Sequence, residues 1–346
     1  MKFNLKHNSF YPPFRGGREG LSPPSEGLGE AIVINNISKS YNKTPALKNI
    51  SLQVQEGELF GLIGPDGAGK TTLMRILMTL LLPDSGQATM NGLDVVADFK
   101  KIRHIVGYMP GRFSLYQDLS VEENLNFFAT VFGTTVEENY DLIRDIYYQI
   151  EPFKKRRAGK LSGGMKQKLA LSCALIHSPK ILVLDEPTTG VDAISRKEFW
   201  NMLKKLQQKG ITILVSTPYM DEANLCDRVA LIQNGGILDV DPPKRITEKF
   251  PRKIIRVRSD EMFRLINDLR KFEKAESVFA FGQFVHFTGI NDEVETSELD
   301  KYLEKLNHNN LLVEEVDPGI EDVFMSLMQE ASPGPSEGGE KKEYNI

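Results

Sequence analysis

The chain has 346 residues, of which 40% are hydrophobic and 26% are charged. These proportions are those of an ordinary globular protein, and the length allows about two domains. A formal net charge of −4 argues against a strongly basic nucleic-acid-binding protein. The two cysteines cannot build a disulfide framework, so the composition fits a reducing compartment. No apolar run approaches the ~18–20 residues that a membrane span needs. We therefore expect any action at a membrane to pass through a partner.

The two ends of the chain differ from its middle. Residues 1–29 and 331–346 are rich in proline, glycine and charged residues, which predicts a flexible N-terminal extension and a disordered tail. Between about residues 31 and 238, short apolar runs alternate with helical stretches, as in an α/β fold. The expected strands are residues 59–63, 105–109, 181–185 and 211–216. The expected helices start near residue 70 and cover residues 121–132, 136–150 and 164–176.

The pattern changes after Pro242 and Pro243. Strands are expected at residues 253–258, 277–281, 284–288 and 311–316, with helices at 261–272 and 296–306. The resulting order, β-α-β-β-α-β, is typical of a ferredoxin-like unit. A last helix is expected at residues 320–329.

A glycine-rich loop follows the expected strand at residues 59–63 and leads into the helix that starts near residue 70. Glycines allow successive backbone N–H groups to curl around phosphates, and the helix N-terminus adds positive potential. A chance glycine turn before a helix is the alternative, which the strand–loop–helix context disfavours. We expect nucleotide phosphates to contact this loop and the residue after it, with Lys70 on the β- and γ-phosphates and Thr71 on Mg²⁺. The residues are Gly64, Pro65, Asp66, Gly67, Ala68, Gly69, Lys70, Thr71 and Thr72.

A second motif is an apolar strand that ends in two carboxylates, Asp185 and Glu186. Ligands of open α/β sheets bind at the carboxyl ends of the strands. Asp185 is therefore expected to hold Mg²⁺, and Glu186 to polarise the attacking water. Such a strand end is a weak signal alone and a strong one beside the glycine loop.

The string Leu161-Ser162-Gly163-Gly164-Met165-Lys166-Gln167 resembles the signature motif of the ABC-type ATPases. The resemblance covers about residues 32–240 and implies a P-loop NTPase fold with a helical subdomain near residues 112–165. It implies a head-to-tail dimer, homo- or heteromeric, in which each ATP lies between one phosphate loop and the signature of the other subunit. It also implies nucleotide contacts from Ser162, Gly163, Gly164, Asp192 and an adenine-stacking Tyr41. Ser162, Lys70 and Glu186 are the expected catalytic residues.

Two positions depart from the family pattern. Gly111 stands where a glutamine usually contacts Mg²⁺ and the attacking water, and Gln117 is a doubtful substitute. Pro218 stands where a histidine usually contacts the γ-phosphate. Proline has neither a side-chain donor nor a backbone N–H. We therefore expect ATP binding to survive, with hydrolysis slow or dependent on a partner.

The predicted organisation is an ATP-binding domain at residues 30–243 and an accessory domain at residues 244–330, whose role the sequence leaves open. Pro318-Gly319-Ile320-Glu321-Asp322-Val323-Phe324 resembles a string near the end of exporter ATPases of the ABC-2 type. This predicts an ATP-binding exporter subunit at the inner face of the cell membrane, driving a separate permease. Cofactors would be ATP and Mg²⁺, and no nucleic acid is expected. The alternatives are a regulatory subunit with little turnover, motivated by Gly111 and Pro218, and a soluble protein acting on ribosomes or DNA.

Overall fold

The computed structural model describes residues 29–331, and the predicted extension and tail lie largely outside this range. Its first part contains two sheets. A four-stranded antiparallel sheet has the order β2-β1-β4-β5. A six-stranded sheet has the order β10-β9-β3-β8-β7-β6 and is parallel except for β10. The strands are β1 (Glu30–Tyr41), β2 (Thr44–Gln55), β3 (Leu59–Ile63), β4 (Ser85–Met90), β5 (Leu93–Asp94), β6 (Val106–Met109), β7 (Ile181–Asp185), β8 (Thr212–Thr217), β9 (Arg228–Gln233) and β10 (Gly236–Asp241).

Three neighbouring strands, β3, β8 and β7, are buried along their whole length. Continuous apolar strands of this kind occur where both faces of a parallel sheet are covered. On one face lie α1 (Lys70–Leu77), α2 (Phe99–Ile105) and the antiparallel sheet, which share one hydrophobic core. The other face shares a core with α6 (Ala193–Gln208) and the helical block. The carboxyl ends of the three strands therefore lie side by side at one edge.

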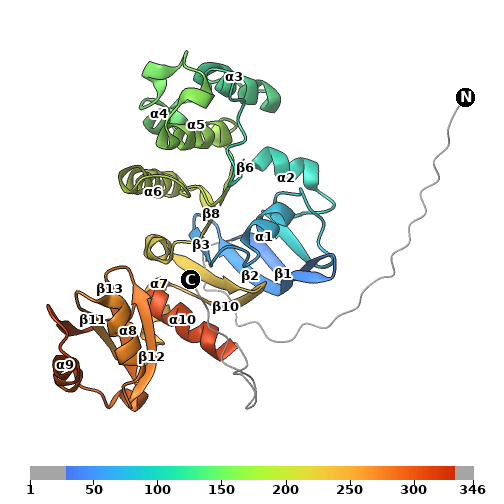
Figure 1. Ribbon diagram of the computed structural model, residues 1–346. Helices are drawn as coiled ribbons and strands as arrows, with labels where there is room; N and C mark the ends of the chain where they lie inside the picture. Colours follow the sequence, from blue (N-terminus) through green and yellow to red (C-terminus); the bar gives the residue numbers. More distant parts are fainter. Residues whose placement is uncertain (1–28, 332–346) are drawn as a thin grey trace, which may run out of the picture.

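The helical block contains α3 (Val121–Phe132), α4 (Tyr140–Tyr147) and α5 (Gly163–Leu175), which gather at one end of the molecule (Figure 1). Two 3-10 turns, η1 (Glu151–Phe153) and η2 (Ala158–Lys160), connect α4 to α5. The predicted helix at residues 136–150 is too long. Thr134 and Thr135 form local hydrogen bonds with Glu138, which compete with helical backbone bonds before Tyr140.

The C-terminal part begins with α7 (Pro243–Glu248). It continues as β11 (Ile254–Arg258), α8 (Met262–Arg270), β12 (Ala275–Phe281), β13 (Phe284–Gly289), η4 (Ile290–Asp292), α9 (Thr296–Lys305) and β14 (Leu312–Val316). The strand order β12-β13-β11-β14 is antiparallel throughout and confirms the predicted ferredoxin-like fold. This unit has its own hydrophobic core.

The last helix, α10 (Ile320–Ala331), lies between the ferredoxin-like unit and α7 (Figure 1). Its buried side chains Ile320, Val323 and Phe324 belong to the large core of the first part, together with Ile246 of α7. It also contacts η3 (Met220–Leu225), which follows β8. The predicted boundary at residue 243 stays a prediction, because both flanking helices pack on the first core. Within residues 29–331, none of the helices is long and apolar enough to cross a membrane.

Candidate active site

The phosphate loop connects β3 to α1, and its glycines are required by close packing. A Cβ on Gly64 would lie 2.1 Å from the backbone oxygen of Ile232. Gly69 has φ 109°, and a Cβ there would lie 2.5 Å from the oxygen of Ala46. Gly69 also caps α1 without a side-chain hydrogen bond. The first N–H groups of α1 therefore have no side-chain cap, an arrangement that suits an anion.

Lys70 is buried at the start of α1. Its Nζ donates to the backbone oxygens of Gly64 at 2.8 Å and Pro65 at 3.0 Å. The same Nζ lies 3.1 Å from Oε1 of Glu186. The ammonium group thus stands between the phosphate loop and the end of β7, where it can attract phosphate oxygens.

The carboxyl end of β7 meets the start of α1. Oδ1 of Asp185 accepts hydrogen bonds from Thr71 Oγ1 at 3.2 Å and from Ser216 Oγ at 2.8 Å. Asp185 is buried, and it forms no ion pair with any side chain within residues 29–331. A buried carboxylate beside hydroxyl oxygens is a donor set that suits Mg²⁺.

Glu186 adopts φ 50°, a left-handed conformation uncommon outside glycine and asparagine. Its backbone N–H donates to Ser216, both to the carbonyl oxygen at 3.1 Å and to Oγ at 3.0 Å. These bonds from β8 hold the turn in place. Strained backbone of this kind is concentrated at functional sites, because surrounding contacts must maintain it.

The signature residues lie in a different place from the phosphate loop. Ser162 caps α5 and accepts a hydrogen bond from the N–H of Met165 at 3.4 Å. A Cβ on Gly164 would lie 2.7 Å from Oγ of Ser195 in α6. Asp192 caps α6 by accepting from Ile194 and Ser195, and these hydrogen bonds lower the pKa of its carboxyl group. The N-termini of α5 and α6, capped by Ser162 and Asp192, therefore form one exposed patch.

Tyr41 ends β1 at a two-residue turn, Asn42 and Lys43, both with positive φ. The tyrosine is 44% exposed. The strand after the turn carries Ala46, whose backbone approaches Gly69 of the phosphate loop. This hairpin end therefore lies beside the loop, as an adenine-stacking residue requires.

The two departures lie next to the site. A Cβ on Gly111 would lie 3.0 Å from the backbone oxygen of Asp185. Pro218 follows Thr217, whose carbonyl accepts a 3.3 Å hydrogen bond from Gly64 of the phosphate loop. Neither glycine nor proline has a side-chain donor. The hydrogen bonds that the usual glutamine and histidine would donate are therefore not available from these two positions. Gln117 instead approaches Gly159, at 3.6 Å from its Oε1 to a Cβ built there.

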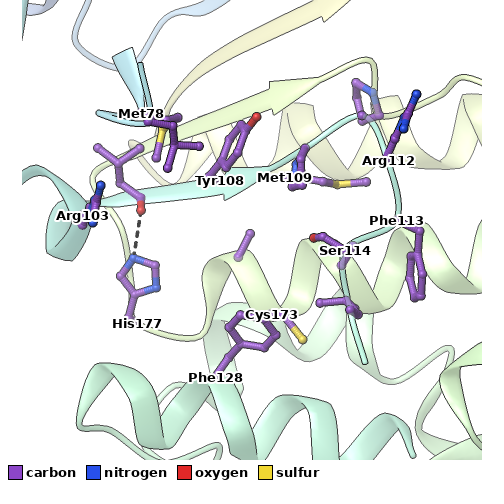
Figure 2. A pocket seen from close by; sticks show the side chains of 18 of the residues that line it. Met78, Arg103, Tyr108, Met109, Arg112, Phe113, Ser114, Phe128, Cys173 and His177 are labelled. Atoms are coloured by element: carbon purple, nitrogen blue, oxygen red, sulfur yellow. Dashed lines mark hydrogen bonds between the residues drawn. The ribbon is translucent and has the colours of Figure 1, made fainter. Parts of the chain in front are cut away.

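A groove of about 510 Å³ lies between β6 and the helical block (Figure 2). Its walls include Val106, Met109, Phe128 and Phe132, and it also contains Glu186. The ring of His177 stacks on Phe132 at 3.8 Å and donates from Nε2 to the oxygen of Val106. Nδ1 of His177 is buried and has no hydrogen-bond partner among residues 29–331.

Sequence reasoning missed a cluster around Glu222, in η3. This carboxylate is 1% exposed and accepts hydrogen bonds from Thr188, two residues after Glu186, and from Thr217, just before Pro218. Arg196 of α6 lies 3.7 Å from it and 4.2 Å from the ring of Tyr219. The hydroxyl and carboxylate partners have no periodic spacing, so only their shared burial reveals them.

Comparison with known proteins agrees with this geometry. The family model described as ABC transporter matches residues 47–189. One relative is named "Probable multidrug ABC transporter ATP-binding protein YbhF" and comes from Escherichia coli (strain K12). It is 45% identical to this chain over 221 residues. That match covers 63% of this chain but only 38% of YbhF, so the chain spans less than half of that relative. The Nod factor export ATP-binding protein I of Rhizobium sp. (strain N33) is 33% identical, with 86% of this chain and 96% of the relative covered.

Solved structures give the same result. An ATP-binding subunit of an ABC transporter has TM-score 0.58 and 26% identity, and covers 64% of this chain and 93% of its own. The post-hydrolysis dimer of the cassette MJ0796, bound to ADP and Pi, has TM-score 0.56 and 26% identity, with coverage of 61% and 98%. The fold is thus that of ABC ATPase cassettes, with a helical subdomain and a ferredoxin-like unit added. The chain belongs to the ABC transporter family of ATP-binding proteins.

Proposed function

We propose that this chain is an ATPase subunit of an ABC exporter that couples ATP hydrolysis to a separate membrane permease. The observation that carries the proposal is the meeting of Lys70, Thr71, Asp185 and Glu186 at the carboxyl ends of adjacent strands. A cation, a buried carboxylate and a base lie together there, beside a loop that offers backbone donors. Enzymes that transfer phosphoryl groups use this set of groups.

In the proposed mechanism, residues 64–72 cradle the phosphates of ATP, and Lys70 exchanges its backbone partners for phosphate oxygens. Glu186 accepts a proton from water as the water oxygen bonds to the γ-phosphorus. The bond from the γ-phosphorus to the ADP oxygen breaks, and ADP and phosphate leave. Tyr41 stacks on the adenine. Mg²⁺, held through Thr71 and Asp185, supplies charge neutralisation when bound.

The same patch geometry supports a head-to-tail dimer. Ser162, Gly163 and Gly164 are on the exposed patch with Asp192, and none of the hydrogen bonds within residues 29–331 joins them to residues 64–72. A complete site would then need the signature of a second subunit, with Ser162 donating to the γ-phosphate. MJ0796, a similar cassette, was captured as a dimer with ADP and Pi.

We further propose that the groove beside β6 receives a helix of the permease, which would hold this subunit at the inner face of the cell membrane. Phe128 and Val131 line the groove, and Val131 is exposed, as a docking surface requires. The export direction is supported by relatives named for multidrug transport and Nod factor export. The name of a further similar structure, cbiO1, describes it as part of the ABC transporter complex cbiONQ.

The experiment that tests the activity compares phosphate release and nucleotide binding in two variants. Glu186→Gln should bind ATP like the wild type and lose about 10²- to 10³-fold in kcat, because the base is removed. Lys70→Ala should lose ATP affinity as well, because the phosphates lose their cation. Wild-type turnover in Glu186→Gln would overturn the assignment of the base.

A further inference from the structure

The groove beside β6 has two ends with different chemistry. At one end lie Phe128, Val131 and Phe132 of α3, and at the other lie Gly111, Glu186 and Pro187. Figure 2 shows Phe128 and Phe113 approaching this space from the helices and the loop after β6, below Met109. One continuous cavity therefore joins the apolar surface of the helical block to the carboxylate proposed as the base.

Gly111 lies at the inner end of the cavity, against the carboxyl end of β7. A Cβ built there would lie 3.0 Å from the backbone oxygen of Asp185 and 3.8 Å from its Oδ2. A longer side chain at this position would enter the space next to the carboxylates. With glycine, no side chain of residue 111 separates the cavity from Glu186 or offers a hydrogen bond there.

The charges lining the cavity indicate what would fill it. Arg103 lies at the end near His177 and Arg112, next to Gly111, lies at the other end (Figure 2), while Glu186 is the carboxylate at the inner end. Glu186 already pairs with Lys70 at 3.1 Å. A second cation at that end would stabilise the ionised carboxylate further and make it a weaker base. A neutral hydrogen-bond donor fits the space beside Glu186, and an acidic side chain fits near each of the two arginines.

We propose that the docked permease helix inserts a neutral donor, an amide or a hydroxyl, through this cavity and presents it beside Glu186. Its apolar face would lie against Phe128 and Phe132, and acidic side chains toward its two ends would face Arg103 and Arg112. The donor would orient the attacking water, so hydrolysis would be slow until the helix is seated. This inference rests on the proposed function, because it assigns a second role to the same groove.

The test uses the full chain and a small amide as the probe. Acetamide, which fits the cavity volume, should raise wild-type kcat several-fold in a saturable manner, with KM for ATP unchanged. Acetone has nearly the same shape but no N–H donor, and should have no effect. Gly111→Gln carries the amide within the chain, so its kcat without acetamide should rise about 10-fold and no longer respond to the probe. Gly111→Met, of similar length and without an amide, should show neither change.

The outcomes separate the inference from the function on which it rests. Equal responses to acetamide and acetone, or no response to either, would overturn the proposed donor site, and so would equal kcat values in Gly111→Gln and Gly111→Met. If Glu186→Gln is inactive in these cases, the ATPase assignment stands and only the donor is lost. If Glu186→Gln hydrolyses ATP like the wild type, the proposed base itself fails.

Discussion

Glu222 is a buried residue that contacts two segments beside the proposed catalytic site. It accepts hydrogen bonds from Thr188, which follows the Glu186 turn, and from Thr217, which precedes Pro218. Pro218 cannot hold its own segment through a backbone donor, so this carboxylate carries more of the positioning. It acts through the two threonines rather than on the nucleotide.

We expect Glu222→Ala to destabilise the fold by about 3 kcal/mol, because two buried hydroxyls lose their acceptor and Arg196 loses one of its two nearby carboxylates. Urea unfolding measures this loss. Asp221→Ala is the matched control, since Asp221 is 70% exposed and also lies 3.7 Å from Arg196. Its cost should stay within ~0.5 kcal/mol. Similar unfolding midpoints for the two variants would contradict the role given to Glu222.

We expect the stability of the fold to depend on pH through His177, which lines the groove. Burial lowers the pKa of its imidazole from 6.5 to about 4. Below pH 6.5 the imidazole of His177 is protonated in the unfolded chain but stays neutral in the folded chain. The free energy of unfolding therefore decreases as the pH falls toward 4. Above pH 6.5 the ring is neutral in both states, so this loss of stability does not occur. The urea midpoint of the wild type should therefore drop between pH 7.5 and pH 5 by more than that of His177→Asn. Parallel pH profiles would show that the buried ring is not responsible.

At the scale of elements, α10 is part of the first core although it follows the ferredoxin-like unit in the chain. Phe324 of α10 is 4% exposed, whereas Phe263 of α8 is 82% exposed. Phe324→Ala should cost about 3–5 kcal/mol through lost burial and a cavity. The same change at Phe263 should cost almost nothing, and thermal unfolding compares the two. Equal melting temperatures would mean that α10 does not pack as the structure has it.

Local patterns made some elements predictable and left others out. The β-α-β-β-α-β order was predicted because apolar residues recur along each strand and helix with the spacing of that element, and turn residues separate the elements. The phosphate loop and the Asp185–Glu186 pair were predicted because their residues are contiguous. The antiparallel sheet of β1, β2, β4 and β5 was not predicted, because its central pairing, β1 with β4, joins segments distant in sequence, although β1–β2 and β4–β5 are hairpins. The Glu222 cluster was missed for the same reason, and α4 was overextended because threonine hydroxyls compete for its first turn.

At the scale of the whole molecule, the two proposed halves of the ATP site do not meet within residues 29–331. The phosphate loop lies at the end of β3, while Ser162 and Gly163 lie at the exposed start of α5. The patch also includes Asp192, so in the proposed dimer its helix N-termini would face a ligand held by another subunit. ATP would then act as the contact between two copies, because each copy supplies only half of its surroundings.

This arrangement makes a prediction about assembly. Glu186→Gln traps unhydrolysed ATP, so it should elute as a dimer with ATP and Mg²⁺ and as a monomer without them, as light scattering measures. Adding Gly163→Asp places a carboxylate against the phosphates of the other subunit, so the dimer should be lost while ATP binding to the monomer persists. Gln283→Glu adds the same charge at an exposed turn between β12 and β13 and should leave the dimer intact. A dimer that survives Gly163→Asp would mean that the signature does not face the nucleotide of a second chain.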